Sequence, residues 1–437
     1  MTPEEEEFLT ELHQNLEKRA IGPDDPRYLA LEAVPGDVLG PDAVRLLGRT
    51  LTRTTEGAAF FLTGLQGAGK SVQLLRLKAE LEQQGYAVVR IDGEDYLNLR
   101  EPLDVTEFLF FLVGAISDTA TESKLIAAED GVQTRGWSRL WEWMRHLPGR
   151  VVLTPTAELG LTAPAPAFLS AKATLKAELR RDASFVAQLR EYLDGRLSEL
   201  TDEANRIVSG IVDDARERWD TGPWKGLIVL VDSLDHNRSV DSDQFHKIRH
   251  ALVNLLDKQR TTITLHRCRT LFTIPMYVPV GGKVGRRVTN IRVRDPDGTP
   301  YQPGVDALKE LLRRRIPGGD LYRLFPDDKA VERLVLASGG HLRDLLILTT
   351  EVETQAESLP VGEDTVTAAI EQVRNDLLPV ADDQKELLRR VAAQHDVPLA
   401  SQQDWTVIAT LFDRHFVLGY QNGKPWYAVH PLLADEL

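Results

Sequence analysis

The stretch that decides the fold is Gly64-Leu65-Gln66-Gly67-Ala68-Gly69-Lys70-Ser71. It matches the spacing G-x-x-x-x-G-K-[ST], in which glycines let successive backbone N–H groups point into one concavity at the start of a helix. Such a concavity binds phosphate. We therefore expect a site for ATP and Mg²⁺ built from Gly64, Gly67, Ala68, Gly69, Lys70 and Ser71. In it, Lys70 would supply a charge to the β- and γ-phosphates, and the Ser71 hydroxyl would be a ligand of Mg²⁺.

The residues on either side of this segment have the periodicity of a strand and of a helix. Residues 58–63 are an apolar run, and residues 71–84 carry leucines at helical spacing before Gly85. Residues 86–91 form a second apolar run. A strand–helix–strand order predicts an α/β fold with a parallel sheet and a crossover helix.

The rest of the chain suggests four domains. We expect an N-terminal helical segment over 1–45, and a core over 46–320 with a helical insertion at about 120–222. A helical lid over 321–380 and a winged helix over 381–437 would follow. The alanine-proline run at 163–167 predicts a linker, and leucines and isoleucines at helical spacing over 171–219 predict a long helix or a helical hairpin. The winged helix rests on helices near 383–394 and 403–415 and on a hairpin that turns at Asn422-Gly423.

A third apolar run, 227–231, ends in Asp232. A carboxylate at the end of a neighbouring strand is the expected Mg²⁺ partner, so we place Asp232 with Ser71 at the metal. The next carboxylate is Asp235, three residues on. It would orient the attacking water, or it would cap the following helix; its position in the sequence does not separate the two.

On these motifs the chain resembles the AAA+ and STAND superfamilies of P-loop ATPases over about 46–437. It is nearest to the branch shared by origin-recognition-type initiators and STAND signalling ATPases. The resemblance implies that Thr273 faces the γ-phosphate as sensor 1, and that Arg343, after Gly339-Gly340, reaches the nucleotide from the lid as sensor 2. The alternatives are an ordinary strand threonine and a solvated helix arginine. Pro275 departs from the arginine that STAND proteins often place after such a threonine.

Two clusters, Arg286-Arg287 and Arg313-Arg314-Arg315, are candidates for an arginine finger acting on a neighbouring subunit, or are solvated faces. His246 and His250 stand four residues apart, but position 247 is Lys where the metalloprotease pattern has Glu. We therefore expect surface histidines there and no metal other than Mg²⁺.

The net charge of the chain indicates which kind of partner it binds. The 437 residues carry a formal net charge of −14, which disfavours general binding to phosphate backbones. In the expected recognition helix, Asp404 and Asp413 outnumber Arg414, and the wing offers Lys424. We therefore expect a protein partner and at most weak DNA binding. We expect a cytoplasmic protein without membrane contact. The chain has a single cysteine, Cys268, it starts with acidic residues, and it lacks an apolar run of about 20 residues.

The resemblance implies a slow ATPase that works as a switch or assembly platform. It would form a nucleotide-dependent homo-oligomer and act with a protein effector, in the manner of bacterial conflict and antiviral defence ATPases. The alternative is a DNA-binding AAA+ ATPase of the replication-initiator or transposition-regulator type. A third reading is a module that binds ATP without hydrolysing it.

Overall fold

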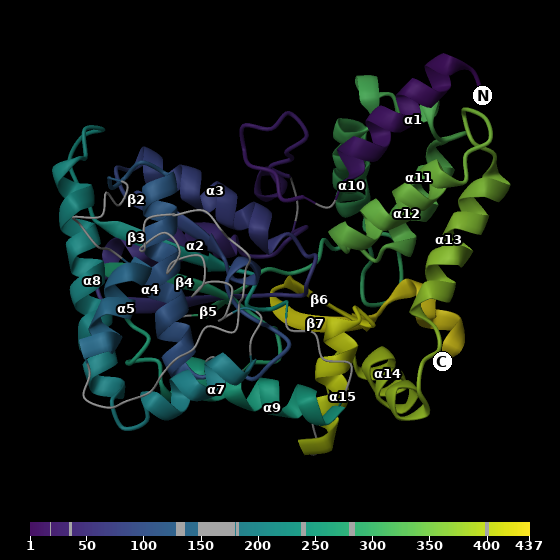
Figure 1. Cartoon of the computed structure of the whole chain (residues 1–437). Helices are drawn as coiled ribbons and strands as arrows, with labels where there is room; N and C mark the ends of the chain where they lie inside the picture. The colour runs from purple at the N-terminus through teal and green to yellow at the C-terminus, as the bar shows by residue number, and fades with distance from the viewer. Residues whose placement is uncertain are drawn as a thin grey trace, which may run out of the picture. The chain divides into compact units, whose positions relative to one another are not determined.

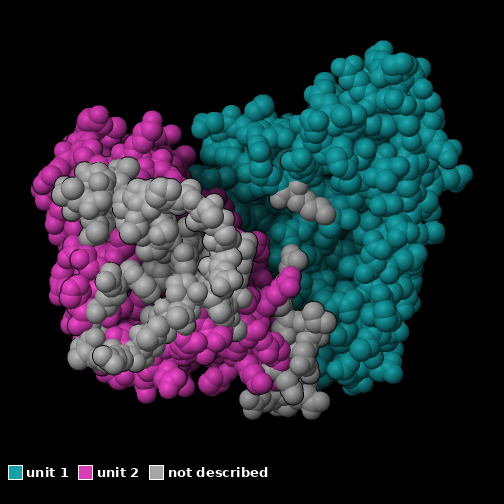
Figure 2. Space-filling view, in the orientation of Figure 1, with its two compact units in different colours: residues 1–44, 63–76, 287–437 teal, residues 45–62, 77–286 magenta. Residues whose placement is uncertain are grey.

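The computed structural model describes residues 1–17, 19–34, 37–127, 136–146, 180, 183–236, 242–278, 285–397 and 402–437. These residues form two compact units, coloured separately in Figure 2. Unit 1 comprises residues 1–44, 63–76 and 287–437, and unit 2 comprises residues 45–62 and 77–286. The phosphate loop expected at 64–71 therefore belongs to the same unit as the C-terminal third of the chain. The expected linker at 163–167 lies outside the described residues.

The sheet has five strands in the order β2-β3-β4-β1-β5. Their bounds are β1 (Ala58–Thr63), β2 (Ala87–Asp92), β3 (Leu227–Asp232), β4 (Cys268–Ile274) and β5 (Gly285–Arg287). β3 pairs in parallel with β2 and with β4, in a register that places Asp92 opposite Asp232 and Phe272 opposite Val231. Every residue of β3 is buried, as expected for an apolar run in a parallel sheet covered on both faces. The α/β class and the strands expected at 58–63, 86–91 and 227–231 are confirmed.

Helices surround the strands of unit 2 (Figure 1). They are α2 (Ala43–Arg53), α3 (Lys70–Gln83), α4 (Val105–Glu122), α5 (Gly136–His146), α7 (Ala183–Tyr192), α8 (Leu197–Glu217) and α9 (Ser242–Val253), with a π-helical turn at Asn254–Lys258. α4 is apolar and buried on nearly all sides, and it packs against α5, α7, α8 and β2. The helical pattern over 171–219 is thus divided between α7 and α8, which a turn at residues 193–196 separates.

Unit 1 contains a helical body and a smaller α/β end. The body comprises α1 (Pro3–Leu16), α10 (Gln302–Arg315), α11 (Asp328–Ala337), α12 (Leu342–Thr354) and α13 (Glu363–Leu377), which share one apolar core. Short 3₁₀ turns lie at Leu31–Ala33, Pro317–Gly319, Leu321–Arg323 and Pro431–Glu436 in this unit, and at Gly93–Asp95 in unit 2. α1 begins with a capping box between Thr2 and Glu5 and packs on α10 and α12.

The C-terminal end comprises α14 (Asp382–Gln394), α15 (Gln402–Asp413), β6 (Val417–Asn422) and β7 (Lys424–Val429). β6 and β7 are antiparallel, and Asn422 pairs with Lys424 across Gly423, whose φ is 96°. The hairpin packs on α14 and α15 (Figure 1). The predicted turn at Asn422-Gly423 and the winged-helix order of two helices and a hairpin are confirmed. Among the described residues, no helix combines the length and apolar character needed to cross a bilayer.

Candidate functional site

The loop at 64–71 lies where the sequence predicts it, between the end of β1 at Thr63 and the start of α3 at Lys70. Gly67 and Gly69 have φ angles of 86° and 92°, in the left-handed region that favours glycine. A side chain at either position would strain the backbone. The two glycines therefore hold the loop in a conformation that other residues reach only at a cost.

The lysine of the loop points into it. Lys70 is only 5% exposed, and its Nζ donates to the carbonyl oxygens of Gly64 at 2.9 Å and Leu65 at 2.6 Å. Thr63 Oγ1 and Gln66 Nε2 are buried with no hydrogen-bond partner among the residues that the structure describes. A buried ammonium held by loop carbonyls, beside polar atoms that lack partners, suits a phosphate group.

The chain has a P-loop NTPase fold.

The first turn of α12 lies directly over this P-loop. A Cβ added at Gly67 would come within 2.7 Å of both Arg343 Cβ and His341 Cε1, and one at Gly69 within 3.0 Å of Leu342 Cδ1. His341 Nε2 lies 2.8 Å from the carbonyl oxygen of Gln66. The structure thus brings Arg343, predicted as sensor 2, against the P-loop at Gly67. The neighbouring His341 contact was not predicted from the sequence.

A glycine pair makes this approach of α12 to the P-loop sterically feasible. Gly339 and Gly340 have φ angles of 59° and 78°. A Cβ at Gly340 would lie 1.8 Å from the carbonyl oxygen of Ile291, so only glycine fits there. The Gly-Gly signal in the sequence therefore reflects a close passage of the backbone immediately before α12.

The acidic strand end lies in unit 2. Asp232 is 1% exposed, and its carboxylate receives hydrogen bonds from Arg90 Nη2 at 2.6 Å and Thr273 Oγ1 at 3.3 Å. Two predicted site residues, Asp232 and Thr273, are therefore in direct contact. Their contact follows from the register of β3 and β4, which places Val231 opposite Phe272. Arg90 was not predicted; the available signal was a charged residue within the apolar run of β2.

Asp235 lies in the turn after β3. It is 5% exposed, and the turn is closed by a hydrogen bond from the His236 N–H to the Ser233 carbonyl at 3.0 Å. Ser233 has a φ of 66°, uncommon for a residue other than glycine. The next helix that the structure describes, α9, begins at Ser242, and residues 237–241 lie outside the described residues, so the capping alternative also stays open. The role of Asp235 in hydrolysis stays a prediction.

Arginines of both clusters have partners within the chain, and their role as an arginine finger stays a prediction. Arg313 and Arg314 pair with Glu310 at 2.8 and 3.0 Å, because residues three and four positions apart share a helix face. Arg315 is buried, and its Nη1 donates to the Asn15 carbonyl at 2.8 Å. Burial lowers the pKa of Arg315 to about 10. Arg287 donates to the Tyr427 hydroxyl at 2.7 Å.

The winged-helix end presents little positive charge at the positions considered for DNA. Arg414 donates to the Leu377 carbonyl at 2.8 Å and lies over the ring of Phe416. Lys424 is exposed at the wing. Trp426 is buried and stacks on Tyr420 with ring centroids 4.4 Å apart, so it belongs to the core of this end.

Comparison with known proteins finds solved structures that align with most of the chain at low sequence identity. No family model and no curated protein matches the chain. A Walker-type ATPase of Pyrococcus abyssi aligns at 12% identity and TM-score 0.36, covering 90% of this chain and 94% of that one. Cdc6p from Pyrobaculum aerophilum aligns at 13% identity and TM-score 0.36, covering 94% of this chain and 95% of that one. The structure of Drosophila ORC bound to DNA aligns at 12% identity and TM-score 0.29, covering 88% of this chain and 90% of that one.

Proposed function

We propose that this chain binds ATP with Mg²⁺ and hydrolyses the ATP slowly, as a switch or assembly platform of the AAA+/STAND type. The observation that carries the proposal is the P-loop itself: Lys70 is buried within it, and the first turn of α12 is seated on Gly67. A loop of this form supplies positive charge and inward-facing donors to phosphates.

The residues of the chain would divide the work. Lys70 would exchange the carbonyls of Gly64 and Leu65 for phosphate oxygens. Ser71 and Asp232 would hold Mg²⁺, which neutralises charge on the β- and γ-phosphates. Thr273, already in contact with Asp232, would face the γ-phosphate. Asp235 would orient the attacking water.

The lid would report which nucleotide is bound. Arg343 stands on the helix turn that covers Gly67, where a long cationic side chain is within reach of a phosphate. A γ-phosphate that engages Arg343 would favour the closed arrangement of α12 on the P-loop, and its loss would release it. We propose that this change alters the surface offered to a protein partner and promotes self-association. The resemblance to conflict and defence ATPases extends the proposal to an antiviral role.

Phosphate release and light scattering test the proposal together. We expect slow release of phosphate by the wild type and none by Lys70→Ala. We also expect a larger particle with a non-hydrolysable ATP analogue than without nucleotide. ATP binding without phosphate release would indicate a module that binds ATP without hydrolysing it. A monomer under all nucleotide conditions, with no partner recovered, would contradict assembly.

A DNA-binding ATPase is the second candidate, favoured by the winged-helix order of α14, α15, β6 and β7. The internal contacts of Arg414 and the single exposed Lys424 at the wing argue against it. Because each neutralised phosphate steepens the salt dependence, we expect a slope of log affinity against log salt of only about −1 to −3. Fluorescence anisotropy with a labelled duplex decides: sub-micromolar binding at physiological salt would make DNA the partner.

A further inference from the structure

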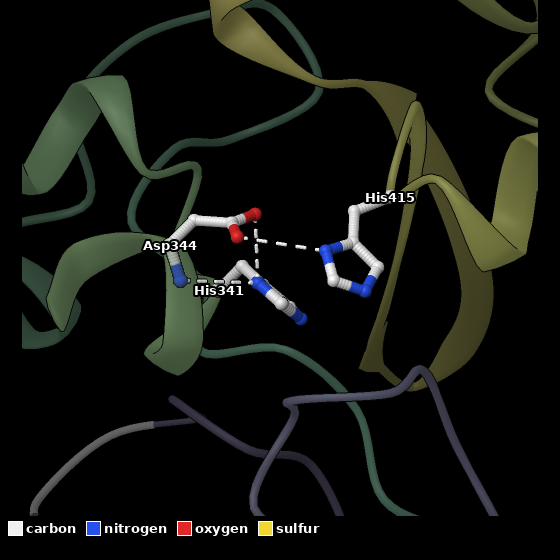
Figure 3. Close-up of side chains that lie close together, drawn as sticks. All are labelled: His341, Asp344 and His415. Atoms are coloured by element: carbon white, nitrogen blue, oxygen red, sulfur yellow. Dashed lines mark hydrogen bonds and ion pairs between the residues drawn. The ribbon is translucent and has the colours of Figure 1, made fainter. Parts of the chain in front are cut away.

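Two histidines and an aspartate converge in unit 1 next to the P-loop (Figure 3). His341 Nδ1 lies 2.8 Å from Asp344 Oδ2, and His415 Nδ1 lies 3.5 Å from Asp344 Oδ1. The three potential ligand atoms are all within 4.8 Å of one another. His341 and Asp344 come from the first turn of α12, and His415 comes from the turn between α15 and β6.

The protonation of His341 is fixed from the other side of its ring. Nε2 must carry a proton, because it faces the Gln66 carbonyl oxygen at 2.8 Å. In this tautomer Nδ1 carries the one ring lone pair, and it lies 2.8 Å from the Asp344 carboxylate. The Asp344 N–H lies 3.4 Å from the same Nδ1, a long contact that a ligand bond from Nδ1 would replace. Two electron-rich atoms at this distance require a cation between them, either a proton or a metal ion.

A fourth side chain, His430, lies beside the Asp344 carboxylate. His430 Nδ1 accepts a hydrogen bond from the Leu432 N–H at 3.2 Å, so its Nε2 carries the proton. That Nε2 lies 3.3 Å from Asp344 Oδ2. Metal-bound histidines and carboxylates commonly have such outer partners, which fix their tautomer and orientation. The Gln66 carbonyl is such a partner of His341, whereas His430 Nε2 lies close to Asp344 Oδ2 without a hydrogen bond.

The position of His415 favours a metal ion over a proton. One proton shared between His341 and Asp344 would already neutralise the carboxylate, yet a second imidazole nitrogen is directed at it. The backbone that places His415 there is the left-handed end of α15, where its φ is 59° and the Phe416 N–H donates to the Leu411 carbonyl oxygen at 2.8 Å. A metal ion would accept the Nδ1 lone pairs of both histidines at once.

We propose that His341 Nδ1, the Asp344 carboxylate and His415 Nδ1 bind a zinc ion. Neutral imidazole and carboxylate are ligands that zinc accepts, and tetrahedral zinc with bonds of about 2.0–2.1 Å sets its ligand atoms roughly 3.3 Å apart. The present separations run to different oxygens, 2.8 Å from His341 to Oδ2 and 3.5 Å from His415 to Oδ1, so the carboxylate would rotate to offer one oxygen to the ion. The fourth position would be taken by water. Through the Nε2 contact of His341 with Gln66, the ion would fasten the P-loop to the lid and to the winged-helix end.

The local sequence gave no signal for this site. His341 and Asp344 have the i, i+3 spacing that puts two side chains on one helix face, but that spacing is common. The third ligand lies far along the chain, beyond α13, α14 and α15. Only the packing within unit 1 brings His415 to the first turn of α12.

Zinc content of the tag-free full-length protein tests the proposal without any nucleotide. The protein is equilibrated with Zn²⁺, desalted against a weak chelator and analysed by mass spectrometry of the metal. We expect about one zinc per chain in the wild type and less than about a fifth of that in His415→Asn. The matched control is His395→Asn, because His395 is also a left-handed histidine of the winged-helix end, with a φ of 52°, and lies outside the cluster.

A second measurement avoids dependence on folding of the variants. Cobalt in a four-coordinate nitrogen and oxygen site gives strong visible absorption, so we expect wild-type protein titrated with Co²⁺ to saturate at one equivalent, and Zn²⁺ to abolish the bands. Absence of bands in the wild type, or equal zinc in the wild type and His415→Asn, would overturn the site and leave a proton-held ion pair. Either result is independent of ATP binding.

Discussion

Nη2 of Arg90 lies 2.6 Å from Oδ2 of Asp232, at the carboxyl ends of the adjacent strands β2 and β3. Asp232 is buried, and the Arg90 side chain is about a quarter exposed, so the carboxylate depends on this guanidinium for charge balance. The pair also restrains the carboxylate that we assign to Mg²⁺. A Mg²⁺ ion bound by Asp232, as we propose, would share this carboxylate with Arg90.

Removing Arg90 tests this dependence. We expect Arg90→Met to lower the free energy of unfolding by about 2–3 kcal/mol, because it leaves a buried charge unpaired. Urea denaturation measures the loss. The double variant Arg90→Met with Asp232→Asn should recover most of it, and saturating ATP·Mg²⁺ should recover part of it in the single variant. A double variant as unstable as the single one would show that Arg90 acts through its packing.

Asp235→Asn separates catalysis from binding. The substitution keeps the size of a buried side chain and removes its basicity, so we expect normal ATP affinity and a fall in phosphate release of about 100-fold. Asp232→Asn is the companion variant, in which Mg²⁺-dependent binding itself should weaken. Unchanged turnover in Asp235→Asn would give the residue a structural role in the turn after β3.

Gly67→Ala tests the seat of α12 on the P-loop. The new Cβ would lie 2.7 Å from Arg343 Cβ and from His341 Cε1, so the loop or the helix must move. We expect ATP affinity to fall at least about tenfold, equivalent to 1.4 kcal/mol. Gly423→Ala is the matched control: its φ of 96° imposes similar backbone strain, but nothing lies within 4 Å of its added Cβ. Equal ATP affinities of Gly67→Ala and Gly423→Ala would show that nucleotide binding does not depend on the contact between α12 and the P-loop.

Glu107 gives stability a pH dependence. Burial raises the pKa of this α4 residue to about 7, although Arg190, 2.5 Å away, opposes the shift. Since the folded pKa exceeds the ordinary value of 4.5, folding is favoured most below pH 4.5, and this contribution is lost as pH rises through 7. We expect a loss of roughly 3 kcal/mol across that window. Urea unfolding at several pH values should show a flatter profile for Glu107→Gln; identical profiles would contradict the shift.

The sequence predicts the P-loop and its flanking strand and helix well, because glycine conformation and apolar periodicity are local properties. It also predicts the hairpin at Asn422-Gly423 and the apolar strand that ends in Asp232. These features depend on a few consecutive residues, so no information about tertiary packing is needed to find them.

Contacts between distant segments could not be predicted from the sequence. Arg90 pairs with Asp232 only because β2 and β3 are neighbours, and the strand order β2-β3-β4-β1-β5 is not encoded in any one segment. The contact of His341 with Gln66 likewise depends on where α12 packs. The arginines at 313–315 looked available because Glu310 lies on the same face only once α10 is formed, and the Asn15 carbonyl reaches Arg315 only when α1 packs on α10.

Isothermal titration of Lys70→Ala with ATP·Mg²⁺ tests the central claim most directly. Lys70 is the buried cation of the P-loop, hydrogen-bonded to Gly64 and Leu65, and it would be the charge that meets the β- and γ-phosphates. The account predicts saturable binding of ATP·Mg²⁺ by the wild type and very weak or undetectable binding by the variant. An affinity unchanged by the substitution would contradict the assignment of the nucleotide site to this loop.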